Sequence, residues 1–327
     1  MSPSFDLLLD AVRDSRRVLL TGPEGLDGDS IGACLALATC LRARVPGLHV
    51  DVAGVPGHRY DWLPGAQGMI PDGRVKSDYD GVVVLDGDRT RLHPDVAAAF
   101  GAARWTGIVD HHRSTDVAGY AVHVFDPDAE STCSIVAAMG RAWGVPVDRA
   151  LAEQLYCGLI FDTGGFRHSN TDASTLRTAA RLLDCGIDHN AICLRTLHER
   201  RPAGAALLGR TLAAVRQPVP AVAIGQIAAG DLRDTGASFS DVEGIIDHLL
   251  HIEGVELAAL MTERAPQQVR LSLRSRRRVD CAQLARALDP QGGGHRRAAG
   301  GALAGPLELV RHIVEPALIA AVLDVQG

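Results

Sequence analysis

The sequence is poor in the features that long nucleic acids need in a binding partner. Aromatic residues make up only 4% of its 327 residues, so stacking platforms for a long single strand are scarce. The formal net charge is −6, which argues against the broad basic surface that backbone binding requires. We therefore expect no long duplex nucleic acid as a partner, whereas a small anion held by a few arginines and metal ions remains compatible with this charge.

Secretion and membrane signals are also lacking. The seven cysteines are scattered and form no C-x-x-C pair, which favours a reducing compartment over a disulfide framework. Residues 1–10 show no basic start followed by an apolar stretch, as a signal peptide would. No apolar run is long enough to span a bilayer. We expect a cytoplasmic protein without a membrane partner.

Short apolar runs alternate with helical patterns in the first half of the chain. Strands separated by helices imply crossover connections and a parallel sheet covered on both faces. A chain of this length is expected to form two domains. We predict an α/β fold with an N-terminal parallel-sheet domain (1–185), a helical connector (186–216) and a smaller C-terminal α/β domain (217–327).

The predicted elements follow from these patterns and their breakers. The strands are expected over 18–20, 48–52, 81–85, 106–109, 121–125, 221–227, 255–262 and 268–273. The helices are expected over 29–41, 131–143, 148–161, 172–184, 189–199, 203–216, 241–251, 280–288 and 306–323. A glycine cluster at 292–294 is typical of a loop.

Acidic and imidazole side chains follow the predicted strands of the first domain. In an open parallel sheet, ligands bind beyond the carboxyl ends of the strands, so these groups are expected to converge. A further acid stands near the end of a predicted helix. The set comprises Asp27, Asp29, Asp86, Asp110, His111, His112 and Asp162.

A divalent cation gives the simplest physical reason for such a set. Clustered carboxylates repel one another, and their burial is costly unless a cation compensates. Carboxylates with histidine suit Mn²⁺ or a similar metal, and a pair of such ions promotes phosphoester hydrolysis. Each group has a plainer alternative by itself: Asp27 and Asp29 as a turn or helix cap, Asp86 as a cap, Asp162 as a buried acid. The joint pattern favours the metal.

These residues resemble the motifs of the DHH phosphoesterase superfamily. Asp110-His111-His112 is similar to its namesake motif, and DGDSIGA (27–33) and LDGD (85–88) are similar to its aspartate motifs. FDTGGFRHSNT (161–171) resembles the fourth acidic motif. VRLSLRSR (269–276) and GGGHRRAAGG (292–301) resemble the DHH-associated C-terminal domain. The nanoRNase and 3′-phosphoadenosine-5′-phosphate (pAp) phosphatase type is the most similar subgroup.

The resemblance implies a role for each position of the first domain. It implies two Mn²⁺ ions, with Mg²⁺ or another divalent cation as the alternative. The implied metal ligands are Asp27, Asp29, Asp86, His111 and Asp162, with Asp86 bridging both ions. Asp110 would orient this set, and His112 would lie close to the scissile phosphate. The attacking group would be a water activated by the metals.

The second domain contributes a candidate anion site. Backbone amides of Gly292, Gly293 and Gly294 can approach an anion closely because glycine lacks a side chain. Arg274, Ser275 and His295 complete the predicted substrate-binding set. The further arginines Arg276, Arg277, Arg278, Arg296 and Arg297, and Arg167 with His168 in the first domain, are either substrate contacts or solvated charges.

One position departs from the family pattern. The family usually has a metal-binding histidine four residues before the first aspartate, where this chain has Pro23. Glu24 or water are the alternatives that could fill the position. We expect the first metal to bind more weakly than usual, or not at all.

We therefore expect a metal-dependent phosphoesterase acting on short oligoribonucleotides, pAp or linear dinucleotides. Two alternatives stay open: a nucleotide-binding sensor with a degenerate metal site, and an inorganic pyrophosphatase. The expected partners are short RNA or a small nucleotide, and base rates favour a homodimer.

Overall fold

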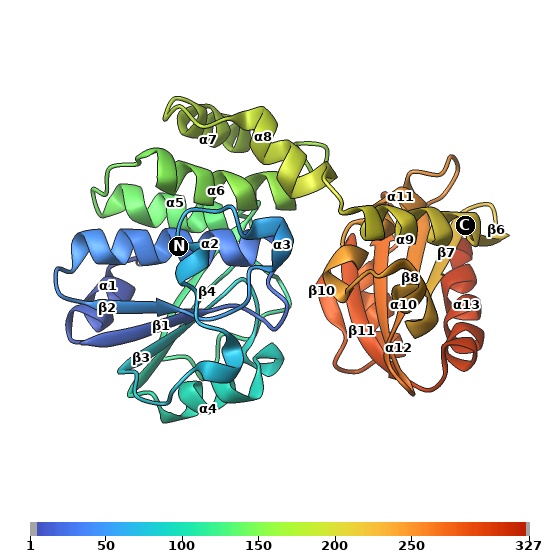
Figure 1. Cartoon of the computed structure of the whole chain (residues 1–327), viewed down its shortest axis with the longest axis horizontal. Helices are drawn as coiled ribbons and strands as arrows, with labels where there is room; N and C mark the ends of the chain where they lie inside the picture. The colour runs from blue at the N-terminus through green and yellow to red at the C-terminus, as the bar shows by residue number, and fades with distance from the viewer. Residues whose placement is uncertain (1–4, 325–327) are drawn as a thin grey trace. The chain divides into compact units, whose positions relative to one another are not determined.

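The computed structural model describes residues 5–324 of the chain. Its contacts divide the chain into two compact units, residues 1–199 and 200–327. Each unit has a sheet of its own, covered by helices (Figure 1). Within residues 5–324, no helix is both long and apolar enough to cross a bilayer.

The first unit is built on a five-stranded parallel sheet of order β2-β1-β3-β4-β5. Its strands are β1 (Arg17–Thr21), β2 (His49–Val52), β3 (Gly81–Leu85), β4 (Trp105–Asp110) and β5 (Val122–Phe125). This sheet confirms the predicted fold class. The strand order places β1, β3 and β4 side by side, so the loops that follow them leave the same edge.

Both faces of this sheet are buried, which explains the continuous apolar strands. Val18 and Leu20 of β1 pack into one cluster, and Leu19 between them packs into a second cluster on the opposite face. Helices α2, α5 and α6 contribute to the first cluster, and α4 contributes to the second. The helices are α1 (Phe5–Arg13), α2 (Gly28–Arg44), α3 (Gly57–Tyr60), α4 (Pro94–Ala102), α5 (Thr132–Ala142), α6 (Arg149–Asp162), α7 (Ala173–Leu183) and α8 (His189–Cys193).

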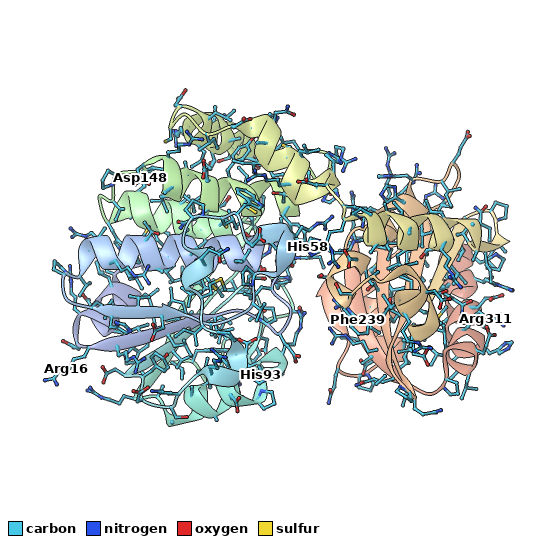
Figure 2. The ribbon with its side chains drawn as sticks, in the orientation of Figure 1. Arg16, His58, His93, Asp148, Phe239 and Arg311 are labelled. Carbon is cyan, nitrogen blue, oxygen red and sulfur yellow. The ribbon has the colours of Figure 1, made fainter. Side chains whose placement is uncertain are left out.

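The helix α6 begins and ends at chemically important residues. Asp148 caps its start by accepting a hydrogen bond from the backbone N–H of Leu151 at 2.9 Å (Figure 2). Its last residue is Asp162, one of the predicted metal ligands. The buried face of α6, which includes Tyr156 and Ile160, anchors this carboxylate on a rigid element.

The second unit contains a six-stranded mixed sheet of order β10-β11-β9-β8-β7-β6. Only β7 and β8 run parallel within it. The strands are β6 (Arg216–Val219), β7 (Val222–Ile227), β8 (Leu257–Ala265), β9 (Gln268–Ser275), β10 (Gly293–His295) and β11 (Ala298–Ala304). The helices are α9 (Pro202–Ala213), α10 (Ala229–Thr235), α11 (Ile245–Leu250), α12 (Cys281–Leu288) and α13 (Leu307–Asp324). The mixed sheet and its helices confirm the α/β fold class for the C-terminal region, whereas the compact unit begins at residue 200, inside the range predicted as a connector.

Three expected elements differ from those observed. The helix expected over 189–199 is α8 followed by a π-helical turn, Leu194–His198. The helix expected over 241–251 is interrupted because Gly244 adopts a left-handed conformation (φ 74°), which separates a 3₁₀ turn from α11. The glycine cluster expected as a loop contributes instead to β10, which pairs with the unpredicted strand β11.

An ion pair between exposed Arg201 and buried Asp241 stabilises the start of the second unit. Arg201 Nε lies 3.2 Å from Asp241 Oδ1, and Ser238 donates to Asp241 Oδ2 from its backbone N–H (2.8 Å) and its hydroxyl (2.9 Å). Burial raises the pKa of Asp241, but the Arg201 and Ser238 hydrogen bonds outweigh it and lower the pKa to about 2. At pH values above the ordinary aspartate pKa, the ionised Asp241 carboxylate therefore stabilises the fold.

We expect Asp241→Asn to destabilise the protein in a pH-dependent way. The free energy of unfolding should fall by about 2 kcal/mol at pH 7, because the folded pKa is depressed. That difference should shrink between pH 4 and pH 2, where the native carboxylate itself becomes protonated. Urea unfolding across this range measures it, with Asp234→Asn as the control in an exposed ion pair with Arg210. An equal cost at pH 7 and pH 2 would contradict the linkage.

Candidate metal centre

Four of the predicted ligands converge at the carboxyl edge of the first sheet. The Nε2 atom of His111 lies 3.1 Å from Asp162 Oδ2, 3.5 Å from Asp86 Oδ1 and 3.9 Å from Asp29 Oδ2. These residues come from the loop after β4, the end of α6, the loop after β3 and the start of α2. Residues more than 130 positions apart in the sequence thus share one small space.

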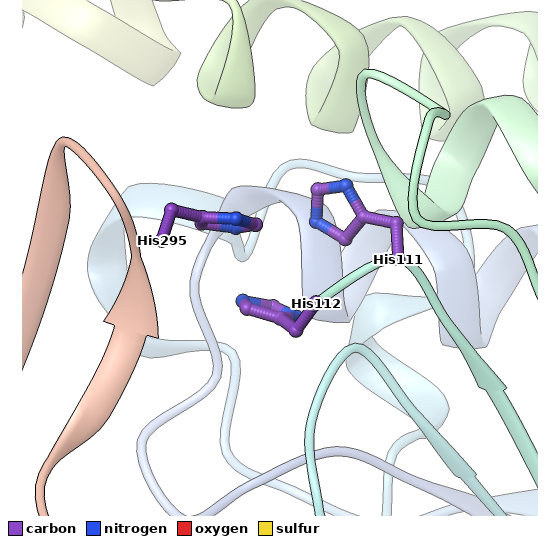
Figure 3. A group of neighbouring side chains, drawn as sticks. All are labelled: His111, His112 and His295. Atoms are coloured by element: carbon purple, nitrogen blue, oxygen red, sulfur yellow. The ribbon is translucent and has the colours of Figure 1, made fainter. Parts of the chain in front are cut away.

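His111 is oriented as a metal ligand would be. Its Nδ1 lies 3.1 Å from the carbonyl oxygen of Ala129. A carbonyl only accepts, so Nδ1 carries a proton, and Nε2 is the ring atom that faces the three carboxylates. A hydrogen bond that fixes the tautomer in this way is the usual second partner of a metal-binding histidine. Figure 3 shows His111 and the adjacent His112 following β4.

Asp29 is completely buried between two helices. Its carboxylate accepts hydrogen bonds from the backbone N–H groups of Thr132 (2.6 Å) and Cys133 (2.9 Å). Both donors belong to the start of α5, where the helix dipole favours a negative charge. The backbone of α5 therefore holds the Asp29 carboxylate in position.

Asp86 has an uncommon backbone conformation directly after β3. Its φ is 59°, in the left-handed region, which costs a non-glycine residue about 1–3 kcal/mol. Its side chain accepts hydrogen bonds from the hydroxyls of Ser30 (2.8 Å) and Thr132 (3.0 Å). The strained conformation and the two hydroxyls together direct the carboxylate at His111.

Asp27 combines two of the uses considered from the sequence. It caps α2, since its Oδ1 accepts from the backbone N–H groups of Asp29 (3.1 Å) and Ser30 (3.0 Å). It also belongs electrostatically to the acidic cluster: burial, and then the charges of Asp86 and Asp162, raise its pKa to about 7. The cap leaves Oδ2 as the oxygen directed away from the helix start.

The electrostatics of the cluster favour a cation. Burial, followed by the charges of Asp86 and Asp162, raises the pKa of Asp29 well above its usual range. Burial lowers the pKa of His111, but hydrogen bonds to Asp162 and Asp86 outweigh it and leave that pKa raised. Both pKa shifts arise because several negative charges lie close together in a buried space. A divalent ion bound there would compensate these charges. The donor set of carboxylate oxygens and one imidazole nitrogen, without thiolate, fits such an ion.

Asp110 and His112 form a second arrangement beside these ligands. The Oδ1 atom of Asp110 accepts from the backbone N–H groups of His111 (2.7 Å) and His112 (3.2 Å), and from Nδ1 of the His112 ring (2.7 Å). Its Oδ2 accepts from the Thr115 hydroxyl. Asp110 is therefore fully engaged in orienting the loop. His112, with about a fifth of its side chain exposed, directs Nε2 away from Asp110.

Pro23, which stands where the family pattern has a metal-binding histidine, lies beside this site. A side chain at Gly87, directly after Asp86, would approach the Pro23 ring to 3.2 Å. Proline supplies no ligand atom from its side chain. Glu24 is exposed, and its charge raises the pKa of Asp72, a residue outside the metal cluster.

Sequence reasoning missed several residues that position the cluster. Ser30 and Thr132 donate hydroxyls to Asp86, and the Ala129 carbonyl fixes His111. Ser30 follows Asp29 in the DGDS motif, and Thr132 lies in the polar run at the start of α5, so their place in the sequence was a usable signal. Gly158 gave no signal: a Cβ there would lie 2.3 Å from Asp29 Oδ1 and 2.3 Å from Cys133 Sγ.

We expect Gly158→Ala to disturb both packing and metal binding. The added methyl group has no room beside the buried Asp29 carboxylate, so the free energy of unfolding should fall by about 1–3 kcal/mol. Mn²⁺ affinity should fall as well, because Asp29 must move. Calorimetry measures both, with Gly101→Ala in α4 as the control, where a Cβ meets nothing within 4 Å. Unchanged stability and affinity would contradict the assigned packing.

In the second unit, Arg274 and His295 lie in one lateral row. His295 of β10 is opposite Ala298 of β11, which in turn is opposite Arg274 of β9. Residues in such a row point to the same face of a sheet, here about 10 Å apart across two strand spacings. The Arg274 guanidinium donates to the Leu273 carbonyl (3.1 Å) and lies 3.7 Å from Asp247.

The other predicted substrate-binding residues have structural contacts. Ser275 is buried and donates its hydroxyl to the Val279 carbonyl at 2.7 Å. The Gly292 N–H donates to the Asp289 carbonyl, and a Cβ at Gly292 would lie 2.7 Å from the Ala285 carbonyl. Gly293 and Gly294 pair with β11, and Gly294 has φ 133°. Gly292 and Gly294 are required by the backbone packing whether or not an anion binds there.

The arginines after β9 also have defined places. Arg276 donates to the carbonyls of Leu250 and Ile252, which closes the end of α11. The backbone N–H groups of Arg277 and Arg278 donate to Glu256. In the first unit, Arg167 Nε donates to the Gly164 carbonyl at 2.7 Å.

Sequence profiles identify both units. The profile for the DHH family, N-terminal domain, matches residues 17–159, and the profile for the DHHA1 domain matches residues 221–319. The chain belongs to the DHH family. The first match ends within α6, so it contains every predicted metal ligand of this DHH protein except Asp162.

Curated relatives and a solved structure extend the match over most of the chain. The DHH protein is 27% identical over 285 residues to the bifunctional oligoribonuclease and PAP phosphatase NrnA of Thermus thermophilus, covering 85% of this chain and 82% of the relative. It is 24% identical to the protein of the same name from Bacillus subtilis, covering 85% and 86%. An exopolyphosphatase-related protein from Bacteroides fragilis shares the fold, with TM-score 0.86, 22% identity, and coverage of 99% and 97%. Family membership and these relatives support a phosphoesterase function, in a family that generally depends on divalent metals.

Proposed function

We propose that this DHH protein hydrolyses short oligoribonucleotides, pAp or linear dinucleotides with the help of a divalent cation, and that Mn²⁺ is the preferred ion. One observation carries the proposal: His111 Nε2 lies within 3.9 Å of carboxylate oxygens of Asp29, Asp86 and Asp162. Two of these acids are almost completely buried, which is costly without a compensating cation.

The ligands and their supporting contacts fit such an ion. Asp29, Asp86, His111 and Asp162 would hold it, with Asp27 Oδ2 available to a second one. A divalent cation bound here would polarise a water molecule and neutralise charge developing on a phosphate oxygen. The chain's own contribution is rigidity, because Thr132, Ser30 and the start of α5 fix the carboxylates before any ligand arrives.

Asp110 and His112 together supply a hydrogen-bond donor for the phosphate. Asp110 holds Nδ1 of the His112 ring at 2.7 Å, so the ring cannot rotate freely and Nε2 faces away from the carboxylate. Burial lowers the pKa of His112, but the hydrogen bond to Asp110 outweighs it and leaves that pKa raised, which favours the doubly protonated ring. In that state Nε2 carries a hydrogen and is oriented to donate it to a phosphate oxygen or to the leaving oxygen. Asp110 acts on the substrate only through this histidine.

The substrate class follows from charge and from the second unit. Phosphate is anionic, whereas the chain carries a net charge of −6, so a short substrate that needs few cationic contacts is favoured over a polymer. Arg274 and His295, in one row of the second sheet, are proposed to bind a terminal phosphate. A cytoplasmic enzyme acting as a homodimer on such molecules remains part of the proposal.

A nucleotide sensor is the second candidate, because Pro23 removes one side-chain ligand. The two functions separate in a single assay of the purified chain with Mn²⁺. The substrates would be a short RNA ladder, pAp, linear di-adenylate, cyclic di-adenylate and pyrophosphate. We expect hydrolysis of the short linear substrates that EDTA abolishes. Binding without turnover of any of them would favour the sensor, and release of phosphate from pyrophosphate alone would favour a pyrophosphatase.

A further inference from the structure

Two backbone segments surround the candidate metal centre and hold different ligands. The segment 129–133 contacts three of them: the Ala129 carbonyl accepts from His111, and Thr132 and Cys133 donate to Asp29 and Asp86. The second segment begins at Asp162 and continues into the loop before α7. Binding geometry at the centre depends on how these two segments are held together.

One side chain joins them directly. The Nδ2 atom of Asn170 lies 3.1 Å from the Glu130 carbonyl oxygen and 3.2 Å from the Asp162 carbonyl oxygen. An asparagine amide nitrogen carries two hydrogens, so it can donate one to each carbonyl at the same time. Aspartate or serine at this position could not make the same pair of bonds.

The loop between Asp162 and Asn170 is shaped to deliver this amide. Gly164, Gly165 and Phe166 follow one another in the left-handed region, with φ of 56°, 69° and 66°. A bulky residue such as phenylalanine rarely adopts this conformation. Phe166 is held there by packing against Tyr156, with ring centroids 6.4 Å apart. The reversal turns the chain back over the end of α6.

His168 makes a second contact to the same carbonyl. Its Nδ1 lies 2.9 Å from the Asp162 carbonyl oxygen, and its ring covers Gly164, where a Cβ would approach Nε2 to 2.5 Å. The Asp162 backbone is therefore fixed by two side chains of its own loop. Only Asn170 also reaches the segment that holds the other three ligands.

We infer that Asn170 is a positioning residue that sets the distance between Asp162 and the Asp29–Asp86–His111 set, and thereby the affinity for the divalent cation. This inference rests on the proposed function, because it requires Asp162 to be a ligand. Asn170 touches neither the cation nor the substrate. Its effect passes through the backbone carbonyls of Asp162 and Glu130.

The test is a double-mutant cycle on Mn²⁺ affinity in the full-length, metal-stripped protein. Asn170→Ala should weaken Mn²⁺ binding in isothermal titration by roughly tenfold to a hundredfold, as for other groups that orient metal ligands. The melting temperature without metal should stay within about one degree of the wild type, because the lost bonds are exposed. Asn190→Ala, which removes an exposed amide from α8, is the matched control and should leave the affinity unchanged.

The second arm separates positioning from a general structural role. In the background of Asp162→Asn, which has already lost the ligand, Asn170→Ala should cause no further loss of affinity. An equal loss in both backgrounds, or no loss in either, overturns the inference. If Asp162→Asn itself leaves Mn²⁺ affinity unchanged, or the wild type binds no Mn²⁺, then the ligand set of the proposed function is wrong as well. If Asp162→Asn lowers Mn²⁺ affinity but Asn170→Ala does not, only the role of Asn170 is overturned.

Discussion

Replacing Asp86 by asparagine should reduce the rate of phosphoester hydrolysis about a thousandfold, a loss of roughly 4 kcal/mol of transition-state stabilisation. Asp86 stands 3.5 Å from His111 Nε2 and supplies the negative charge at the centre of the ligand set. Asparagine tolerates the left-handed backbone at this position. Ser30 and Thr132 donate to different oxygens of Asp86, so the single amide oxygen of asparagine can accept from one of them. The substitution therefore removes the charge while it keeps the shape and one of the two hydroxyl hydrogen bonds.

The control lies two residues further along the same motif. Asp88 accepts a hydrogen bond from the Thr90 N–H at 2.7 Å and caps a short 3₁₀ turn. Asp88→Asn should leave kcat within about twofold of the wild type, because none of the three candidate metal-ligand groups among the described residues includes it. Steady-state kinetics on pAp or a short RNA with Mn²⁺ compares the two variants. Full activity of Asp86→Asn would show that the centre is assigned wrongly.

The second large effect concerns the number of bound ions. Pro23 stands where the family pattern has a metal-binding histidine, so under the proposed function the wild type should retain close to one tightly bound ion per chain after desalting. A missing ligand should weaken the first site by at least the hundredfold that loss of a supporting group can cost. Pro23→His restores an imidazole beside the loop that follows Asp86, and it should raise the retained metal toward two ions per chain.

Elemental analysis and native mass spectrometry count these ions without reference to activity. Pro71→His provides the control, since it adds the same imidazole at an exposed proline elsewhere in the first unit. Only Pro23→His should gain a tight ion. A wild-type chain that already retains two ions per molecule would refute the idea that Pro23 weakens the first site.

The convergence of the proposed metal-binding residues was predictable because parallel strands impose a common edge. Asp86 and Asp110 end apolar runs that read as strands, so their convergence follows from topology alone. The same reasoning reached His111 and His112. Asp162 was placed from its motif, and its side chain does lie 3.1 Å from His111.

Sequence patterns could not predict the contacts that depend on the detailed course of the backbone. The strand β10 escaped prediction because its residues Gly293 and Gly294 have no β-branched or apolar side chains to signal a strand. The bridge made by Asn170 depends on three consecutive left-handed residues, one of them Phe166, which no periodicity reveals. Long-range hydrogen bonds between loops leave no pattern in a single sequence.

The position of the bound metal ion is the central prediction for this protein. Crystals soaked in MnCl₂ and measured at the manganese absorption edge locate the ion by its anomalous scattering. The account predicts a strong peak bonded to His111 Nε2 and to the carboxylates of Asp29, Asp86 and Asp162. A peak elsewhere, with these four side chains still bonded only to protein atoms, would contradict it.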